Sequence, residues 1–132
     1  MGATIFYLRR ERKEREVPKL DVYPRVAILV PCHNEEVVIR DALIQLSYNR
    51  YPNFEIIAIN DGSTDRTGVI AGALSKEDPM VRVLHHPFNR GYGVALRTGF
   101  EAAKGEAVLF MDADGQFDIT DLTTMLKELK TC

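Results

Sequence analysis

Short apolar runs alternate with amphipathic segments from Val26 onward, and this alternation restricts the fold more than any other feature of the chain. Four continuous apolar runs, the third more exposed than the others, are predicted as strands at residues 26–30, 54–59, 81–84 and 107–111. Helical spacing of apolar residues follows each run, at residues 38–46, 67–74, 92–103 and 120–130. Four strand–helix pairs predict an α/β fold, a three-layer sandwich with helices on both faces of a mostly parallel sheet.

Composition excludes several other classes of protein. The chain is 45% apolar and 27% charged, as in soluble globular domains, and its net charge of -2 argues against a nucleic-acid binder that uses a broad basic field. Cys32 and Cys132 cannot form a disulfide framework, so reduced thiols in the cytosol are expected. No window approaches the ~20 apolar residues that span a bilayer.

Residues 1–24 are predicted to form a basic N-terminal arm, and residues 25–132 the compact domain. The arm contains Arg9–Glu16, a run of five basic and three acidic residues that is typical of a solvated helix or a frayed segment. Alternatively, Ala3–Leu8 is the tail of a membrane helix and the basic run is its cytoplasmic flank. The second interpretation places the full-length protein at the cytoplasmic face of a membrane.

Polar residues follow the first predicted strand in the segment Pro31–Glu36, with the sequence PCHNEE. Ligands of parallel sheets bind outside the carboxyl ends of the strands, so such segments are the place to look for a site. Pro31 is expected to end the strand and Asn34 to cap the next helix, with His33, Asn34 and Glu35 directed at a ligand. A plain helix N-terminus whose acidic residues complement the helix dipole is the alternative.

The second strand is followed by Asn60–Asp65, with the sequence NDGSTD. Gly62 permits a tight turn, and Ser63 or Asp65 is available to cap the helix. Asp61 lies at the strand tip, where its carboxylate can accept two hydrogen bonds from a nucleobase edge or a ribose. A simple strand-to-helix turn explains the segment equally well.

Two carboxylates, Asp112 and Asp114, follow the fourth strand and lie on the same side of the chain. Unpaired, they would repel each other, and a divalent cation such as Mg²⁺ or Mn²⁺ removes that cost. A solvated acidic turn is the alternative. An EF-hand loop counted from Asp112 is excluded, because its sixth and twelfth positions hold Phe117 and Thr123.

The segment Asn89–Arg97, which leads from the third strand into its helix, contains two glycines, Gly91 and Gly93. It is predicted to be a flexible loop that leads to a helix, and Arg90 and Arg97 face either phosphate oxygens or solvent. His85 and His86, just before it, are interpreted as part of a surface loop rather than as a metal pair.

Three of these segments together resemble the family 2 glycosyltransferases, which have the Rossmann-like GT-A fold. The matching segments are Pro31–Glu36, Asn60–Asp65 and Asp112–Gln116. A fourth segment, Gly91–Gly99, is most similar to the branch that includes polyprenyl-phosphate sugar synthases of the dolichol-phosphate mannose synthase type. The resemblance covers residues 25–118 and implies a truncated sheet with strand order 3-2-1-4.

The resemblance implies a role for each matching residue. Pro31, His33 and Glu35 would line a nucleotide pocket, and Asp61 would contact the base. Asp112 and Asp114 would form the Asp-X-Asp site for ribose and metal, with Arg97 and Gln116 near the diphosphate. The implied reaction transfers a sugar, with inversion, from a UDP- or GDP-sugar to a polyprenyl phosphate, lipid or polysaccharide acceptor.

The resemblance also implies that the acceptor half and the general base lie beyond Cys132. The 132-residue chain is therefore expected to bind nucleotide without completing transfer. The fourth strand is expected to present an unpaired edge, which favours a homodimer through that edge.

Two other functions remain open on sequence grounds. Residues 108–115 also look like the nucleophile strand of haloacid-dehalogenase-type phosphatases, with Asp112 as nucleophile, although Gln116 stands where that motif has threonine. A non-catalytic nucleotide-binding module is the second alternative.

Overall fold

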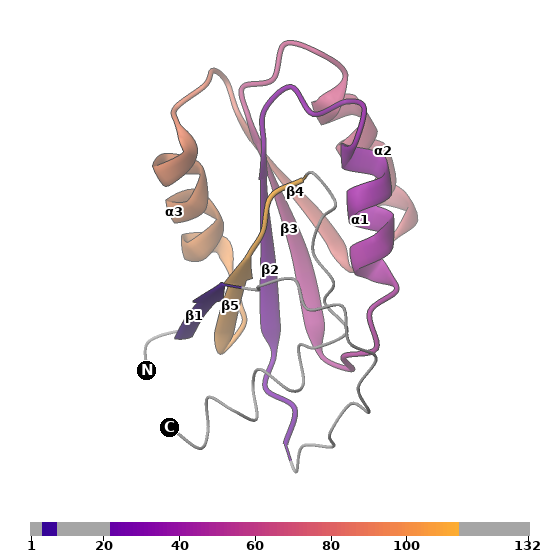
Figure 1. Ribbon diagram of the computed structural model, residues 1–132, viewed down its shortest axis with the longest axis vertical. Coiled ribbons are helices and arrows are strands. Elements are labelled where there is room, and N and C mark those ends of the chain that lie inside the picture. The colour runs from indigo at the N-terminus through magenta and orange to yellow at the C-terminus, as the bar shows by residue number, and fades with distance from the viewer. Residues whose placement is uncertain (1–3, 8–21, 114–132) are drawn as a thin grey trace.

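A five-stranded parallel sheet forms the centre of the computed structural model, which describes residues 4–7 and 22–113 (Figure 1). The strands lie in the order β1-β5-β2-β3-β4. They are β1 (Thr4–Tyr7), β2 (Val26–Cys32), β3 (Phe54–Asp61), β4 (Val81–His86) and β5 (Ala107–Phe110). The helices are α1 (Ile39–Ser47), α2 (Thr67–Glu77) and α3 (Tyr92–Ala102).

The helices lie on both faces of the sheet, α1 and α2 on one and α3 on the other (Figure 1). Alternate residues of β2 and β3 supply two separate cores, as in a sheet buried on both faces. Ile28 and Ile56 belong to the core beneath α1 and α2, whereas Leu29 and Ile57 belong to the core beneath α3. The predicted α/β class and the order 3-2-1-4 are confirmed, since β4-β3-β2-β5 is that order.

Helix α3 packs closely on the sheet through its small residues. Ala95 and Gly99 are its buried positions, and a Cβ atom on Gly99 would lie 2.7 Å from Cδ1 of Ile59. The larger apolar residues Leu96 and Phe100 line a groove of about 190 Å³ beside β5. The helix turns its smallest face to the sheet because only that face permits such a close approach.

The edge beside β5 is occupied by the chain's own N-terminal residues. β1 pairs in parallel with β5 from Thr4↔Ala107 to Tyr7↔Phe110. The expected unpaired edge is therefore wrong, and the homodimer through it loses its physical reason. Thr4–Tyr7 are extended, so they do not form the tail of a membrane helix. Within the described ranges, no helix is long and apolar enough to cross a membrane.

Strands β2 and β5 separate near their carboxyl ends. Their pairing stops at Leu29↔Phe110, whereas β2 continues beside β3 to Cys32↔Asn60. Pro31 therefore does not end its strand, contrary to expectation. The Leu29 carbonyl accepts a hydrogen bond from Met111 N on the β5 side, and Pro31, two residues later, faces the same side beyond the last β5 pair. Its missing N–H costs no ladder hydrogen bond there.

The opposite end of the sheet contains a buried acidic residue, Glu55. Its carboxylate lies 2.9 Å from Nη2 of Arg25 and 3.3 Å from Nη1 of Arg82, and it accepts a hydrogen bond from Lys104 N. The side chain of Glu55 is only 4% exposed, while both arginines reach solvent. One carboxylate thus connects the starts of β2 and β4 to the segment after α3.

We expect Glu55→Gln to lower the free energy of unfolding by about 1–3 kcal/mol, because a buried charged acceptor is lost while its donors stay in place. Urea denaturation measures the change. Glu101→Gln is the matched control, since the Arg97–Glu101 pair is 80% and 68% exposed and such pairs contribute at most ~1 kcal/mol. Equal losses in the two variants would contradict the assigned role of Glu55.

Candidate functional site

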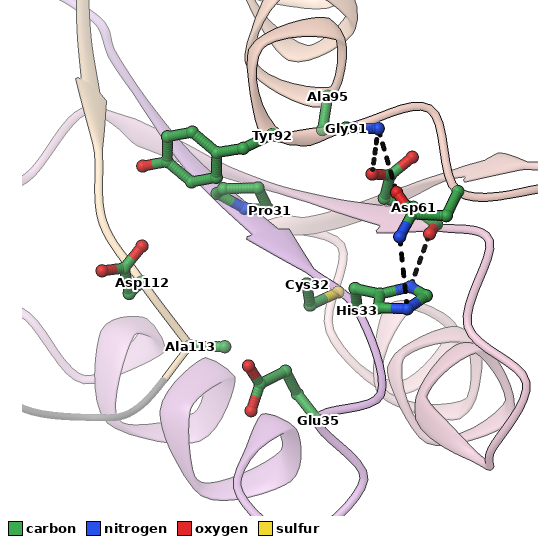
Figure 2. A pocket seen from close by; sticks show the side chains of 11 residues that line it. Pro31, Cys32, His33, Glu35, Asp61, Gly91, Tyr92, Ala95, Asp112 and Ala113 are labelled. Atoms are coloured by element: carbon green, nitrogen blue, oxygen red, sulfur yellow. Dashed lines mark hydrogen bonds between the residues drawn. The ribbon is translucent and has the colours of Figure 1, made fainter.

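A cleft of about 410 Å³ opens where β2 and β5 separate, a size typical of small-molecule sites (Figure 2). The carboxyl ends of β2 and β3, the segments after β2, β4 and β5, and the start of α3 form its walls. The lining residues are Pro31, Cys32, His33, Glu35, Asp61, Asn89, Gly91, Tyr92, Ala95, Asp112 and Ala113. In the view of Figure 2, Asp112 lies on the left and Asp61 and His33 lie on the right.

Asp61 is buried at the tip of β3 and holds the loop that follows β4. Its Oδ1 accepts hydrogen bonds from His86 Nδ1 at 2.8 Å and Arg90 N at 2.9 Å, and its Oδ2 accepts one from Gly91 N at 3.0 Å. Burial opposes ionisation, but these donors outweigh it, so the pKa of Asp61 lies below its ordinary value. The carboxylate is therefore charged at neutral pH, and its network is lost only in acid.

His33 connects the segment after β2 to the same loop. Its Nδ1 lies 2.8 Å from the Asp61 carbonyl, which only accepts, so Nδ1 is the donor. Its Nε2 lies 3.4 Å from Nδ2 of Asn89, and Oδ1 of Asn89 accepts a hydrogen bond from Gly91 N. Both nitrogens of His33 thus have protein partners, and the exposed ring borders the cleft.

Asn34 links two segments rather than capping a helix. Its φ is +53°, and its Oδ1 accepts a hydrogen bond from Thr64 N at 2.8 Å. Helix α1 begins at Ile39, with no side-chain cap, so the predicted cap is wrong. Of the two caps expected for α2, Asp65 bonds the helix start, through Thr67 N at 2.9 Å, whereas Ser63 accepts a bond from Asn34 N.

The cleft is acidic. Glu35, Asp61 and Asp112 all line it, and the part of its wall that the structure describes includes no lysine or arginine. Asp112 is exposed at the end of β5, while Asp114 and Gln116 lie outside the described residues. Such a cleft repels an anionic ligand unless a cation accompanies it.

Cys32 lines the cleft as a protonated thiol. Burial first, and then the charges of Glu35, Asp65 and Asp61, raise its pKa to about 12. Its Sγ donates to the Ile59 carbonyl at 3.4 Å. Cys32 therefore contributes shape and packing to the cleft rather than a nucleophile.

Arg97 is not among the residues that line the described part of the cleft, so its expected place beside a diphosphate stays a prediction. It is two residues beyond Ala95, about 200° around the helix, so it projects away from the wall that Ala95 forms. Its side chain is 80% exposed, and its Nε lies 3.3 Å from Oε1 of Glu101. Arg97 instead borders the groove beside β5.

His86, Asn89, Gly91 and Tyr92 were not among the predicted site residues. His86 is 8% exposed and bonds Asp61, so its expected place in a surface loop is wrong. His85, by contrast, is exposed and contacts Asn60. The alternation of side chains along a strand could have predicted the burial of His86. His86 lies two residues after Leu84 and so shares its sheet face, and Leu84 packs in the core beneath α3.

Two relatives of this chain among known proteins are both named as glycosyltransferases. The chain is 40% identical over 110 residues to "Probable glycosyltransferase YdaM" of Bacillus subtilis, covering 76% of the chain and 26% of that protein. It is 34% identical over 114 residues to "Dolichyl-phosphate beta-glucosyltransferase ALG5A" of Trichomonas vaginalis, covering 80% of the chain and 35% of that protein. The chain thus spans about a quarter to a third of these relatives.

Solved structures share the fold. The mannosyltransferase PcManGT of Pyrobaculum calidifontis, in complex with GDP-Man and Mn²⁺, matches with a TM-score of 0.77 and 29% identity, over 89% of this chain and 36% of that one. S. aureus TarS 1-349, in complex with UDP-GlcNAc, matches with a TM-score of 0.67 and 27% identity, over 79% and 31%. The family model for glycosyl transferase family 2 matches residues 27–131. The fold, the segments at the strand tips and this match together show that the chain belongs to glycosyl transferase family 2.

Proposed function

We propose that residues 25–132 bind the nucleoside-diphosphate sugar of an inverting glycosyltransferase. The observation that supports this most directly is the acidic cleft at the point where β2 and β5 separate, which three segments after strands line. Two solved relatives are described in complex with GDP-Man or UDP-GlcNAc. Family membership disfavours a haloacid-dehalogenase-type phosphatase with Asp112 as nucleophile.

The chemistry of the cleft fits a divalent cation that accompanies the diphosphate. A diphosphate brings several negative charges to a wall that already contains Glu35 and Asp112. Asp112 offers the hard oxygen donors that Mg²⁺ and Mn²⁺ prefer, and we propose Asp114 as its partner and Gln116 as a nearby phosphate contact. When bound, the cation would stabilise the negative charge of the leaving nucleoside diphosphate.

The nucleoside is proposed to lie between the segment after β2 and the loop after β4. Pro31 and Ala95 supply apolar surface there, and His33 supplies the exposed ring described above. Each carboxylate oxygen of Asp61 has more than one acceptor position, so Oδ2 can accept from Gly91 N and from a base or ribose donor together. Glu35 completes the proposed pocket.

Acceptor recognition and the general base are proposed to belong to the further length that the relatives possess. A polyprenyl phosphate, lipid or polysaccharide acceptor and attachment at the cytoplasmic face of a membrane belong to the same proposal. The name of the dolichyl-phosphate relative supports them, whereas the extended residues Thr4–Tyr7 do not. We expect the 132-residue chain to bind nucleotide without transferring sugar. Robust transfer by the purified chain would contradict that expectation.

Calorimetric titration with UDP and with GDP, each with and without Mn²⁺, tests the donor site. We expect one nucleotide to bind in a Mn²⁺-dependent manner, and Asp112→Asn to remove that dependence together with most of the affinity. Asp41→Asn is the matched control, because Asp41 is an exposed carboxylate in the first turn of α1. Absence of binding to both nucleotides in the presence of Mn²⁺ would overturn the proposal.

A further inference from the structure

A buried histidine outside the cleft wall supports the acidic residue that lines it. His86 ends β4, and its Nδ1 lies 2.8 Å from Oδ1 of Asp61. Its Nε2 lies 2.9 Å from Oγ1 of Thr98 on α3. The side chains of His86 and Asp61 are each 6% exposed, so this contact is shielded from water.

The direction of the hydrogen bond between His86 and Asp61 follows from the chemistry of Asp61. A carboxylate only accepts, so Nδ1 of His86 carries the shared proton. The Thr98 hydroxyl also lies 3.0 Å from the carbonyl of Val94, one turn earlier in α3, which holds that hydroxyl in place. The imidazole ring therefore joins the tip of β3 to the middle of α3 through two polar contacts.

Asp61 in turn holds the backbone of the loop between β4 and α3. Arg90 N and Gly91 N both donate to its carboxylate, and Gly91 lines the cleft. Gly91 has a φ of +96°, a conformation that non-glycine residues rarely adopt, so this turn requires glycine at the position whose N–H Asp61 binds. A rotation of the Asp61 carboxylate would release both N–H groups and move the cleft wall.

We propose that His86 is a positioning residue for nucleotide binding. It fixes the carboxylate of Asp61 in the one orientation that holds residues 90–91 and leaves acceptor capacity on the oxygen facing the cleft. His86 touches no ligand in this role and acts only through Asp61. The inference rests on the proposed nucleotide site and adds to it the residue that sets its geometry.

Three single substitutions of His86 distinguish the contribution of its contact with Asp61 from that of its contact with Thr98. The amide nitrogen of Asn reaches the position of Nδ1, whereas that of Gln reaches the position of Nε2, and Leu places no polar atom at either position. We expect His86→Leu and His86→Gln to weaken nucleotide affinity in Mn²⁺ at least tenfold, and His86→Asn to restore most of it. His85→Gln is the matched control, since His85 is exposed and contacts Asn60 rather than Asp61.

Calorimetry and amide hydrogen exchange give the decisive readouts. In His86→Leu we expect faster exchange at Arg90 N and Gly91 N, with exchange in the core of β2 unchanged. Thr98→Val provides a milder variant that retains the Asp61 contact, and a smaller loss of affinity in the same direction is expected. Wild-type affinity in His86→Leu, or rescue by Gln as complete as by Asn, would overturn the inference. A wild-type chain that binds no nucleotide would instead overturn the proposed function.

Discussion

Gly62→Ala is expected to lower the free energy of unfolding by about 2–5 kcal/mol, through backbone strain together with overpacking. Gly62 follows β3 with a φ of +67°, a conformation that disfavours any residue with a Cβ atom. A Cβ there would lie 2.1 Å from the carbonyl carbon of Phe88 and 2.2 Å from Asn89 N. Both contacts are with backbone, so no side-chain rotation relieves them. Urea denaturation followed by circular dichroism measures the loss.

Gly72→Ala is the control for this prediction. Gly72 lies within α2, and no atom lies within 4 Å of the Cβ that alanine would add. Alanine is favoured over glycine in a helix by up to about 1 kcal/mol, so this variant should match or exceed wild-type stability. A Gly62→Ala variant with the wild-type denaturation midpoint would show that the two loops do not meet at this position.

Asp61→Asn is expected to reduce nucleotide affinity in Mn²⁺ more than tenfold. The substitution preserves the volume of the side chain but replaces one acceptor oxygen by an NH₂ group. That group must face one of the donors that Asp61 now binds, namely His86 Nδ1, Arg90 N or Gly91 N. Hydrogen bonds to charged groups contribute ~1.5–3 kcal/mol each, and ~1.4 kcal/mol corresponds to tenfold in affinity. Calorimetric titration measures the change.

Asp65→Asn provides the comparison, because it lies in the same turn but not in the cleft wall. Its carboxylate accepts from Thr67 N and Glu36 N, so we expect a loss of stability with nucleotide affinity preserved. Equal loss of affinity in both variants would assign the effect to the turn as a whole.

The pH dependence of the Asp61 network has a defined sign. Because the folded-state pKa of Asp61 is depressed, its contribution to stability is complete above the ordinary carboxyl pKa of ~3.9 and disappears as the pH falls through the folded value. Acid denaturation of the wild type should therefore show a contribution that Asp61→Asn lacks.

Much of the fold could be predicted because burial on both faces leaves a simple pattern in the sequence. The apolar runs of β2, β3 and β5 predict the alternation of strands and helices, and the family resemblance implies the order of the strands. The place of β1 could not be predicted, since a short apolar segment beside a charged run fits several structures. The length of β2 depended on where β5 leaves it, which is a property of two strands that are distant in the sequence.

The residues that line the cleft from the carboxyl ends of the strands could be predicted to lie together. Pro31, His33, Glu35, Asp61 and Asp112 all line one cleft, as parallel strands bring their carboxyl ends to one edge. Arg97 lies outside the lining of this cleft, because its orientation depends on which face of α3 packs on the sheet, and the small residues Ala95 and Gly99 set that face.

The sequence by itself determined the α/β class and the gathering of carboxylates at one edge of the sheet, because both follow from local periodicity and chain direction. Only the tertiary structure decided which polar groups bond one another. Asp61 accepts from residues 25 to 30 positions later in the chain, and His86 gains its partners from β3 and α3. Such pairings depend on which face of the sheet each strand residue occupies and on how each helix is rotated about its axis. They require atoms to be placed to within about an ångström, and sequence spacing does not encode distances at that scale.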